Sequence, residues 1–250
     1  MRLPLLLSLL LAGSLACAAG TTTTVSSTNT STTAAKKKKK PDHWHARVKQ
    51  IKAELNKLPA GTSNTIVLLG DSITERFKTS RDLHEMDGHL VINEGIGGDQ
   101  IVRTKAKTGV IHRLDLVAQA KPAVVFVMIG TNDFGTGKKG VDEVLVQYNH
   151  MLQLLRAAVP DARIIVVSTF PTVGRGDRND KIKALNAKLP AFAKQVHGEY
   201  LDMFSRLADK DGHLKAEYSI DGVHPKPPAY DIWIAAMKQK LEEKVPAKGK

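Results

Sequence analysis

Short apolar runs recur along this chain, and most of them end at a glycine or a polar residue. They occupy residues 65–69, 90–92, 123–129, 162–169 and 200–201. Runs that are apolar at nearly every position are typical of strands in a parallel sheet that is covered on both faces. We therefore expect a five-stranded parallel sheet.

Amphipathic segments separate these runs. Residues 141–158, 180–196 and 228–241 carry apolar side chains at the spacing of a helix. Alternation of strands and helices favours right-handed crossovers that place helices on both faces of a sheet. The predicted fold class is α/β, a three-layer α/β/α sandwich that occupies residues 42–243.

The N-terminal residues have the pattern of an export signal. Residues 1–2 begin it with a positive charge, residues 3–11 are apolar, and residues 16–18 read Ala-Cys-Ala, which is typical of a cleavage site. We expect residues 1–19 to be a signal peptide and the protein to be secreted or periplasmic. An alternative is a lipid-anchored form attached through Cys17, the only cysteine.

Positive charge is concentrated near the ends of the chain. The formal net charge is +12, but residues 42–243 hold 28 of the 37 basic residues and all 25 acidic ones. This near balance argues against nucleic-acid binding by the folded part. Residues 20–41 are rich in threonine and serine and include the lysines from Lys36 to Lys40, so we expect a disordered linker. These lysines could contact an anionic envelope, and residues 244–250 form a basic tail.

Polar and glycine-rich clusters follow three of the predicted strands. They lie at residues 70–74, 93–99 and 130–133, and a fourth cluster at 221–225 precedes the last predicted helix. In an open α/β sheet, ligands bind outside the carboxyl ends of the strands. We therefore expect these clusters, which are distant in sequence, to form one site.

The four clusters together hold the groups that acyl transfer requires. The Ser72 hydroxyl needs a base to become a nucleophile, and His224 can supply one. Asp221, three residues earlier, can orient the His224 ring. The N–H of Ser72, an N–H of the loop at 97–98 and the side-chain amide of Asn132 could bind an oxyanion.

Each cluster also has a structural interpretation. Gly-Asp-Ser is a common helix-capping turn, and Asn132 could cap the helix after its strand. The glycines at 97–98 could cradle a phosphate, but the chain lacks the P-loop and dinucleotide patterns. His43 and His45 have no further ligands at useful spacing, so we expect no metal and no cofactor. The occurrence of all four clusters in order favours catalysis.

The clusters resemble the four sequence blocks of the SGNH hydrolases, also called GDSL-type esterases and lipases. The blocks are matched by Gly70-Asp71-Ser72, by the segment from Asn93 to Asp99, by Gly130-Thr131-Asn132-Asp133 and by the segment from Asp221 to His224. The resemblance spans residues 64–241. It implies a flavodoxin-like sheet, a catalytic set of Ser72, Asp221 and His224, and an oxyanion hole of Ser72, Gly98 and Asn132.

Details within the blocks are similar to the acetylhydrolase-like branch of this family. They are Gly-Ile-Gly-Gly-Asp, Gly-Thr-Asn-Asp, and His-Pro before a Tyr-x-x-Trp helix. This branch includes the catalytic subunits of platelet-activating-factor acetylhydrolase and bacterial carbohydrate O-acetylesterases. The resemblance therefore implies hydrolysis of short-chain, acetyl oxygen esters of small molecules or glycans through an acyl-Ser72 intermediate.

Two other functions are consistent with the same residues. One is a lysophospholipase or thioesterase that acts on longer acyl chains, and the other is a non-catalytic envelope- or carbohydrate-binding module on the same fold. The loop at 172–180 carries Arg175 and Arg178, which could meet an anionic substrate or keep the loop soluble, and we expect the latter. The sequence leaves the oligomeric state open.

Overall fold

The central sheet contains the five predicted parallel strands and one additional strand. The computed structural model describes residues 42–77, 83–135, 139–173 and 177–243, all within the unit Lys40–Lys250. The strands are β1 (Thr65–Gly70), β2 (Glu85–Met86), β3 (His89–Gly95), β4 (Pro122–Met128), β5 (Arg163–Val167) and β6 (Glu199–Leu201). Their order is β2-β3-β1-β4-β5-β6, and only β2 runs antiparallel to its neighbour.

The order of the parallel strands fixes where a site can form. Taken in chain order, the five strands lie 2-1-3-4-5, which is the flavodoxin-like order with its switch point between β1 and β4. Gly70 at the end of β1 pairs with Gly95 on β3 and with Met128 on β4. The segments that leave these three strands therefore start side by side at one edge of the sheet. The predicted fold class is confirmed.

The additional strand β2 forms a short hairpin with β3. Asp87 and Gly88, which connect the two strands, both have positive φ angles, 51° and 75°. Two successive positive φ angles are typical of the tight hairpin turn that an Asp-Gly pair favours. The five-stranded prediction omitted β2 because two residues are too few to give a periodic pattern, although the Asp-Gly pair was a usable signal.

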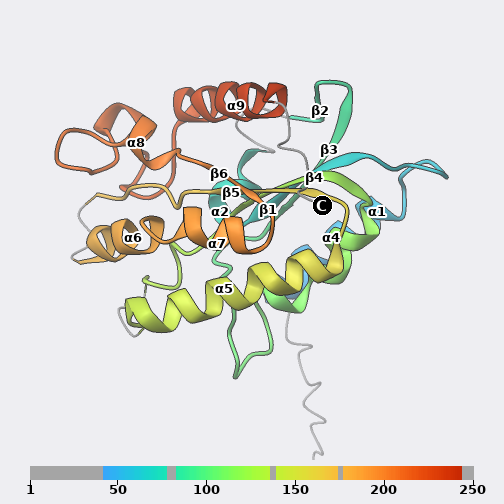
Figure 1. The fold of residues 1–250 in the computed structure, drawn as a ribbon, viewed down its shortest axis with the longest axis horizontal. Coiled ribbons are helices and arrows are strands. Elements are labelled where there is room, and N and C mark those ends of the chain that lie inside the picture. Colours follow the sequence, from blue (N-terminus) through green and yellow to red (C-terminus); the bar gives the residue numbers. More distant parts are fainter. Residues whose placement is uncertain (1–41, 78–82, 136–138, 174–176, 244–250) are drawn as a thin grey trace, which may run out of the picture. The chain divides into compact units, whose positions relative to one another are not determined.

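Helices cover both faces of the sheet (Figure 1). They are α1 (His43–Leu55), α2 (Ser72–Glu75), α4 (Leu114–Gln119), α5 (Val141–Ala158), α6 (Arg178–Asn186), α7 (Leu189–Gln195), α8 (Phe204–Leu207) and α9 (Pro227–Glu242), with 3₁₀ turns η1 (Val110–His112) and η2 (Ala216–Tyr218). In Figure 1, α9 lies above the sheet, and α4, α5 and α7 lie below it. This arrangement is the predicted three-layer sandwich.

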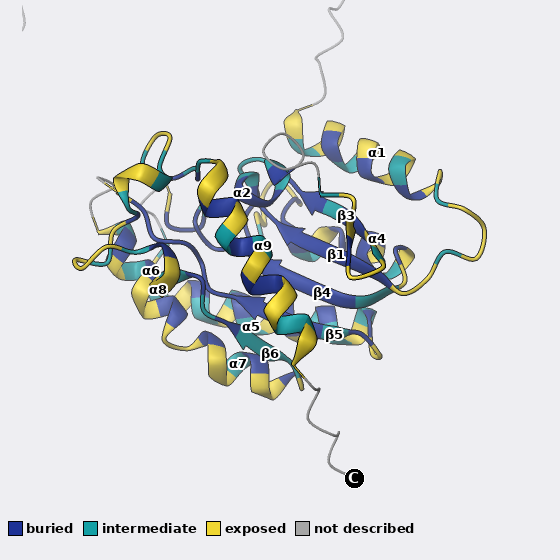
Figure 2. Cartoon of the chain, turned by 90° about the horizontal axis from the view of Figure 1, so that it is seen from above, coloured by how far each residue is buried: buried dark blue, intermediate teal, exposed yellow. Residues whose placement is uncertain are grey.

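Alternate residues of each strand face opposite layers, as strand geometry requires. Leu68 belongs to the apolar cluster that contains Trp233 of α9, whereas Leu69 belongs to the cluster that contains Tyr148 of α5. All four side chains are at most 1% exposed. The strands are consequently buried on both sides, and α9 turns one buried face toward them (Figure 2).

The amphipathic segment at 180–196 forms two helices instead of one. Helix α6 ends at Asn186, and α7 begins at Leu189 with Pro190 in its first turn. Proline lacks the N–H that a helix interior requires but is tolerated in the first turn of a helix. The periodicity continued across this break, because the apolar faces of α6 and α7 pack in the same core cluster.

Three of the predicted segments lie at the ends of the chain. The signal peptide at 1–19 with Cys17, the linker at 20–41 and the tail at 244–250 lie outside the described residues. No helix in the described ranges is long and apolar enough to cross a membrane.

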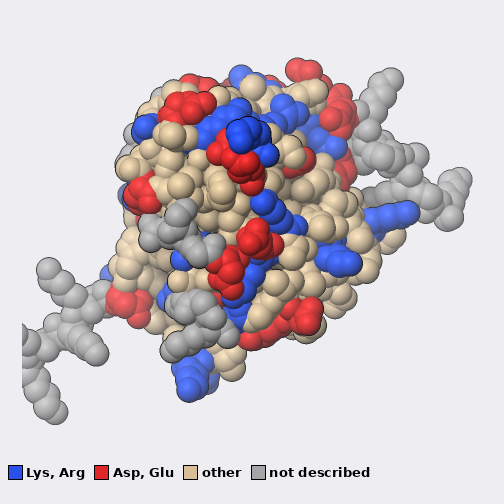
Figure 3. Space-filling model, turned by 90° about the vertical axis from the view of Figure 1, so that its left-hand side faces the viewer, with Lys and Arg blue, Asp and Glu red and all other residues tan. Residues whose placement is uncertain are grey.

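On the side of the molecule shown in Figure 3, acidic and basic side chains are interspersed.

Candidate active site

The turn between β1 and α2 places Ser72 at the edge of the sheet. Asp71 caps α2, since its Oδ1 accepts a hydrogen bond from Ile73 N at 2.9 Å. Ser72 is the first residue of the helix. A Cβ at Gly70 would collide with the Thr74 side chain and the Met128 backbone oxygen, so this position has room only for glycine. This explains the Gly-Asp-Ser order of the first cluster.

The turn before α9 brings His224 to the Ser72 hydroxyl. Ser72 Oγ lies 3.0 Å from His224 Nε2, and His224 Nδ1 lies 2.7 Å from Asp221 Oδ2. The other carboxylate oxygen, Asp221 Oδ1, accepts hydrogen bonds from Val223 N at 3.0 Å and His224 N at 2.9 Å. The local turn thus fixes the carboxylate, and the carboxylate in turn orients the imidazole.

The Asp221 carboxyl stays ionised in this environment. Burial raises its pKa, but hydrogen bonds from the backbone and ring of His224 and from Val223 N outweigh burial and hold the pKa well below its usual range. An ionised carboxylate accepts the Nδ1 proton of a neutral imidazole and leaves Nε2 as the acceptor for a hydroxyl proton. This is the tautomer in which His224 can act as a base toward Ser72.

Two backbone amides are available near the Ser72 hydroxyl. Within the described residues, the N–H groups of Ser72 and Gly98 make no hydrogen bond. Gly98 has a φ angle of 72°, in the region that favours glycine. Its neighbour Gly97 donates to Glu75 Oε2 at 2.5 Å, and the same oxygen lies 3.1 Å from His43 Nε2. Glu75 therefore anchors the loop that carries Gly98.

Asn132 follows β4 and reaches the same place through its side chain. Its Nδ2 donates to the Asp99 backbone oxygen at 2.9 Å and lies 3.4 Å from Asp71 Oδ2. The longer contact is close to the limit for a hydrogen bond. An amide nitrogen carries two hydrogens, so the second hydrogen of Asn132 Nδ2 can be donated to an oxyanion in place of the long contact with Asp71.

All five predicted site residues line one hollow with a volume of about 390 Å³. The lining consists of Ser72, Gly98, Asn132, Arg178, Asp221, Val223 and His224. Sequence reasoning missed Val223 and assigned Arg178 to solubility, whereas Arg178 faces the hollow. A lone arginine in a polar loop gives no signal of this position. Arg175 lies outside the described residues.

The two candidate metal ligands, His43 and His45, lie on α1 and make other contacts. His43 contacts Glu75, and His45 Nδ1 lies 2.9 Å from Asp42 Oδ1. In the described ranges, no group of three or more histidine, cysteine, aspartate or glutamate residues is arranged to hold a metal ion.

Comparisons with known proteins identify the family of this chain. The model of the GDSL-like lipase/acylhydrolase family matches residues 68–232, a range that includes all five predicted site residues. The platelet-activating factor acetylhydrolase IB subunit alpha2 of Gallus gallus is 25% identical over 173 residues, which cover 66% of this chain and 70% of that protein.

Two solved structures share the fold. A GDSL-like lipase from Bacteroides thetaiotaomicron is 27% identical with a TM-score of 0.66, over 79% of this chain and 98% of its own. A serine-to-alanine variant of an acetyl esterase, solved with an acetate ion, is 25% identical with a TM-score of 0.53, over 71% of this chain and 96% of its own.

Proposed function

Because this chain belongs to the GDSL-like lipase/acylhydrolase family and is an ester hydrolase, we propose that it cleaves short-chain, acetyl oxygen esters through an acyl-Ser72 intermediate. The observation that carries the proposal is the continuous chain of contacts from Ser72 Oγ to His224 and on to Asp221, at 3.0 and 2.7 Å. Both distances suit proton transfer from a serine hydroxyl to an oriented imidazole.

Acylation begins when His224 Nε2 takes the Ser72 proton and Ser72 Oγ bonds to the ester carbonyl carbon. The carbonyl oxygen becomes an oxyanion, which the N–H groups of Ser72 and Gly98 and the Asn132 side chain stabilise. The C–O bond to the alcohol then breaks, and His224 Nε2–H gives its proton to the departing oxygen. The products of this step are the free alcohol and acyl-Ser72.

Deacylation repeats these roles with water as the nucleophile. His224 Nε2 takes a proton from water as its oxygen bonds to the acyl carbon, and the same donors stabilise the second oxyanion. The bond to Ser72 Oγ breaks, Ser72 regains its proton from His224, and the carboxylic acid departs. Asp221 remains ionised throughout and stabilises the imidazolium that forms twice in each cycle.

The lining of the hollow supports a short acyl group. Among the seven described residues that line it, Val223 has the only purely hydrocarbon side chain, whereas sites for long chains need extensive apolar surface. The names of the similar proteins point the same way, since one is an acetylhydrolase and another an acetyl esterase. These observations favour acetyl esters over the long acyl chains of a lysophospholipase or thioesterase.

A chain-length series tests the acyl preference. We expect kcat/KM for 4-nitrophenyl acetate to exceed that for the butyrate, and the octanoate to be the poorest substrate. A maximum at the octanoate would instead support the long-chain alternative. Failure of the protein to hydrolyse any of these esters, or to label with a fluorophosphonate, would support the non-catalytic binding module. A panel that includes acetylated xylan would separate glycan from small-molecule esters.

We also propose that residues 1–19 direct export, on the basis of their sequence pattern. The intact mass of the protein recovered from the producing cell is the test. Loss of about nineteen residues supports cleavage of a signal peptide. An added lipid mass at Cys17 would identify the lipid-anchored form instead, and an uncleaved N-terminus in the cytoplasm would contradict export.

A further inference from the structure

Arg113 lies beneath the candidate site without lining its hollow. It occupies the position between η1 and α4, and only 1% of the residue is exposed. Each of its three nitrogens donates a hydrogen bond to a different segment. Nε donates to Asp99 Oδ2 at 3.0 Å, Nη1 to the backbone oxygen of Glu94 at 2.7 Å and Nη2 to the backbone oxygen of Gly70 at 3.0 Å.

Each of these acceptors lies within four residues, along the chain, of a group that would bind the oxyanion. Gly70 ends β1, two residues before Ser72. Glu94 lies at the end of β3, where the chain enters the loop that carries Gly98.

The third acceptor, Asp99, is connected to both Gly98 and Asn132. Asp99 directly follows Gly98, and the Asp99 backbone oxygen accepts the 2.9 Å hydrogen bond from Asn132 Nδ2. One guanidinium therefore connects, through single hydrogen bonds, the segments that hold all three donors.

The charges around Arg113 favour a fixed geometry. Asp99 and Arg113 are each 1% exposed, and Asp99 Oδ2 lies 3.0 Å from Arg113 Nε. A buried ion pair stays formed because an unpaired buried charge is costly. Trp44 Nε1 donates to Asp99 Oδ1 at 3.1 Å, so both oxygens of this carboxylate have donors.

We propose that Arg113 is a positioning residue that sets the relative placement of the Ser72 N–H, the Gly98 N–H and the Asn132 amide. The inference rests on the proposed function, because it assigns these groups to an oxyanion. Lysine could keep the positive charge, but its single nitrogen does not reproduce the planar three-point fork of a guanidinium. Arg113→Lys therefore separates geometry from charge.

The test measures 4-nitrophenyl acetate hydrolysis by wild type, Arg113→Lys, Asn132→Ala and the double variant. We expect Arg113→Lys to lower kcat by about 10- to 100-fold, less than the loss of a whole oxyanion donor, with KM changed by less than about threefold. In the Asn132→Ala background, Arg113→Lys should lower kcat by a clearly smaller factor, because the two residues act on one group of donors. Binding of a trifluoromethyl ketone, whose serine adduct carries an oxyanion, should weaken in parallel with kcat.

Arg156→Lys is the matched control. Arg156 also donates to several backbone oxygens, including those of Val196 at 2.9 Å and Ala162 at 2.8 Å, but at the far end of α5. We expect it to lower the melting temperature without lowering kcat. A kcat near wild type for Arg113→Lys, or losses that multiply fully in the double variant, would overturn the inference.

Asp99→Asn provides a second route if Arg113→Lys does not fold. It keeps the shape of the side chain, but with Oδ1 bonded to Trp44 Nε1 it places an amide NH₂, which cannot accept a hydrogen bond, opposite Arg113 Nε. We expect the same fall in kcat and the same reduced effect beside Asn132→Ala, whereas unchanged kcat would overturn the inference. Ser72→Ala in the same assay keeps the two proposals apart, because full turnover by that variant would refute the proposed function itself.

Discussion

Ser72 Oγ and His224 Nε2 lie 3.0 Å apart although 152 residues separate them in sequence. Packing between α2 and α9 maintains this contact. Tyr230 on α9 donates a 2.8 Å hydrogen bond from its hydroxyl to the backbone oxygen of Ile73. The ring of Phe77 also lies 4.6 Å from that of Trp233. The turn that carries His224 is thus held against the start of α2 by buried aromatic side chains directly behind it.

Replacing Asn132 by alanine is expected to lower kcat by about 10²–10³, the cost of one lost oxyanion donor. KM for 4-nitrophenyl acetate should change little, because the donor acts mainly in the transition state. Steady-state kinetics give both values. Asn186→Ala is the control, since that amide bonds to the backbone of Thr169 and its loss should affect stability alone. Equal kcat for Asn132→Ala and wild type would remove Asn132 from the mechanism.

Replacing Asp221 by asparagine should remove the charge that stabilises the His224 imidazolium and lower kcat by up to about 10⁴. The folded pKa of Asp221 lies below its usual range. The carboxylate therefore contributes to stability above its ordinary pKa of about 3.9, and this contribution is lost as the pH falls further. Protonation of Asp221 consequently cannot explain a loss of activity between pH 7 and 5.

Asp209→Asn is the matched control for this prediction. Asp209 Oδ1 also accepts backbone hydrogen bonds, from Asp211 N and His213 N at 2.9 Å each, but Asp209 does not line the hollow. We expect its kcat to match wild type at every pH from 5 to 8. A similar kcat for Asp221→Asn and Asp209→Asn would contradict the assigned role of Asp221.

Asp71 should make the protein less stable as the pH rises. Burial, together with the nearby carboxyl groups of Asp99 and Asp133, raises the pKa of Asp71 to about 7. The folded protein therefore binds a proton that the unfolded chain releases near pH 4. The resulting stabilisation is present below pH 4 and is lost as the pH rises through 7. Burial also raises the pKa of Glu94 to about 7, so ionisation of Glu94 likewise lowers stability as the pH rises.

Asp71→Asn isolates this effect, since asparagine does not titrate. Relative to wild type, the variant should gain stability between pH 5 and pH 8, on the order of a few kcal/mol. Urea denaturation at the two pH values measures the change, and constant effects of the substitution cancel in the comparison. A difference from wild type that is the same at both pH values would show that Asp71 does not titrate as described.

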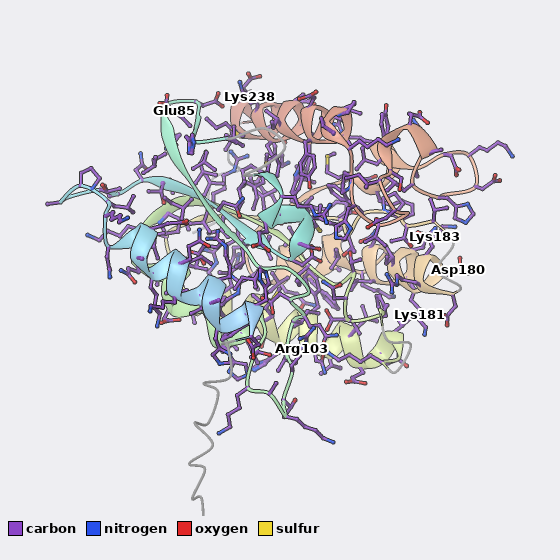
Figure 4. All side chains as sticks on the ribbon, turned by 180° about the vertical axis from the view of Figure 1, so that it is seen from behind. Glu85, Arg103, Asp180, Lys181, Lys183 and Lys238 are labelled. Carbon is purple, nitrogen blue, oxygen red and sulfur yellow. The ribbon has the colours of Figure 1, made fainter. Side chains whose placement is uncertain are left out.

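Arg178 places a positive charge in the hollow beside the reacting groups. Asp177, the residue before α6, pairs with Lys181, and Asp180 pairs with Lys183. Figure 4 labels Asp180, Lys181 and Lys183. We expect Arg178→Gln to raise KM for 4-acetoxybenzoate several-fold, because the substitution removes about 1 kcal/mol of attraction between the arginine and the substrate carboxylate. KM for its neutral methyl ester should not change. Lys181→Gln is the control, and equal effects on both esters would exclude charge recognition by Arg178.

The sequence predicted the elements that are long or that carry distinctive chemistry. The apolar runs identified β1, β3 and β4, and the clusters at their ends contained Ser72 and Asn132. Arg113 could not be identified in this way, because nothing local distinguishes a buried arginine from an exposed one. Its partners come from three distant segments, so its burial is a property of the tertiary structure. The position of Arg178 depends on the fold in the same way.

The most direct test of the account is the turnover of 4-nitrophenyl acetate by Ser72→Ala, with Ser205→Ala as an exposed control on α8. Both variants should fold like wild type, because Ser72 is partly exposed and its backbone is unchanged. We predict that Ser72→Ala loses several orders of magnitude in kcat, as removal of a triad nucleophile does, and no longer labels with a fluorophosphonate. Wild-type turnover by Ser72→Ala would contradict the acyl-Ser72 mechanism.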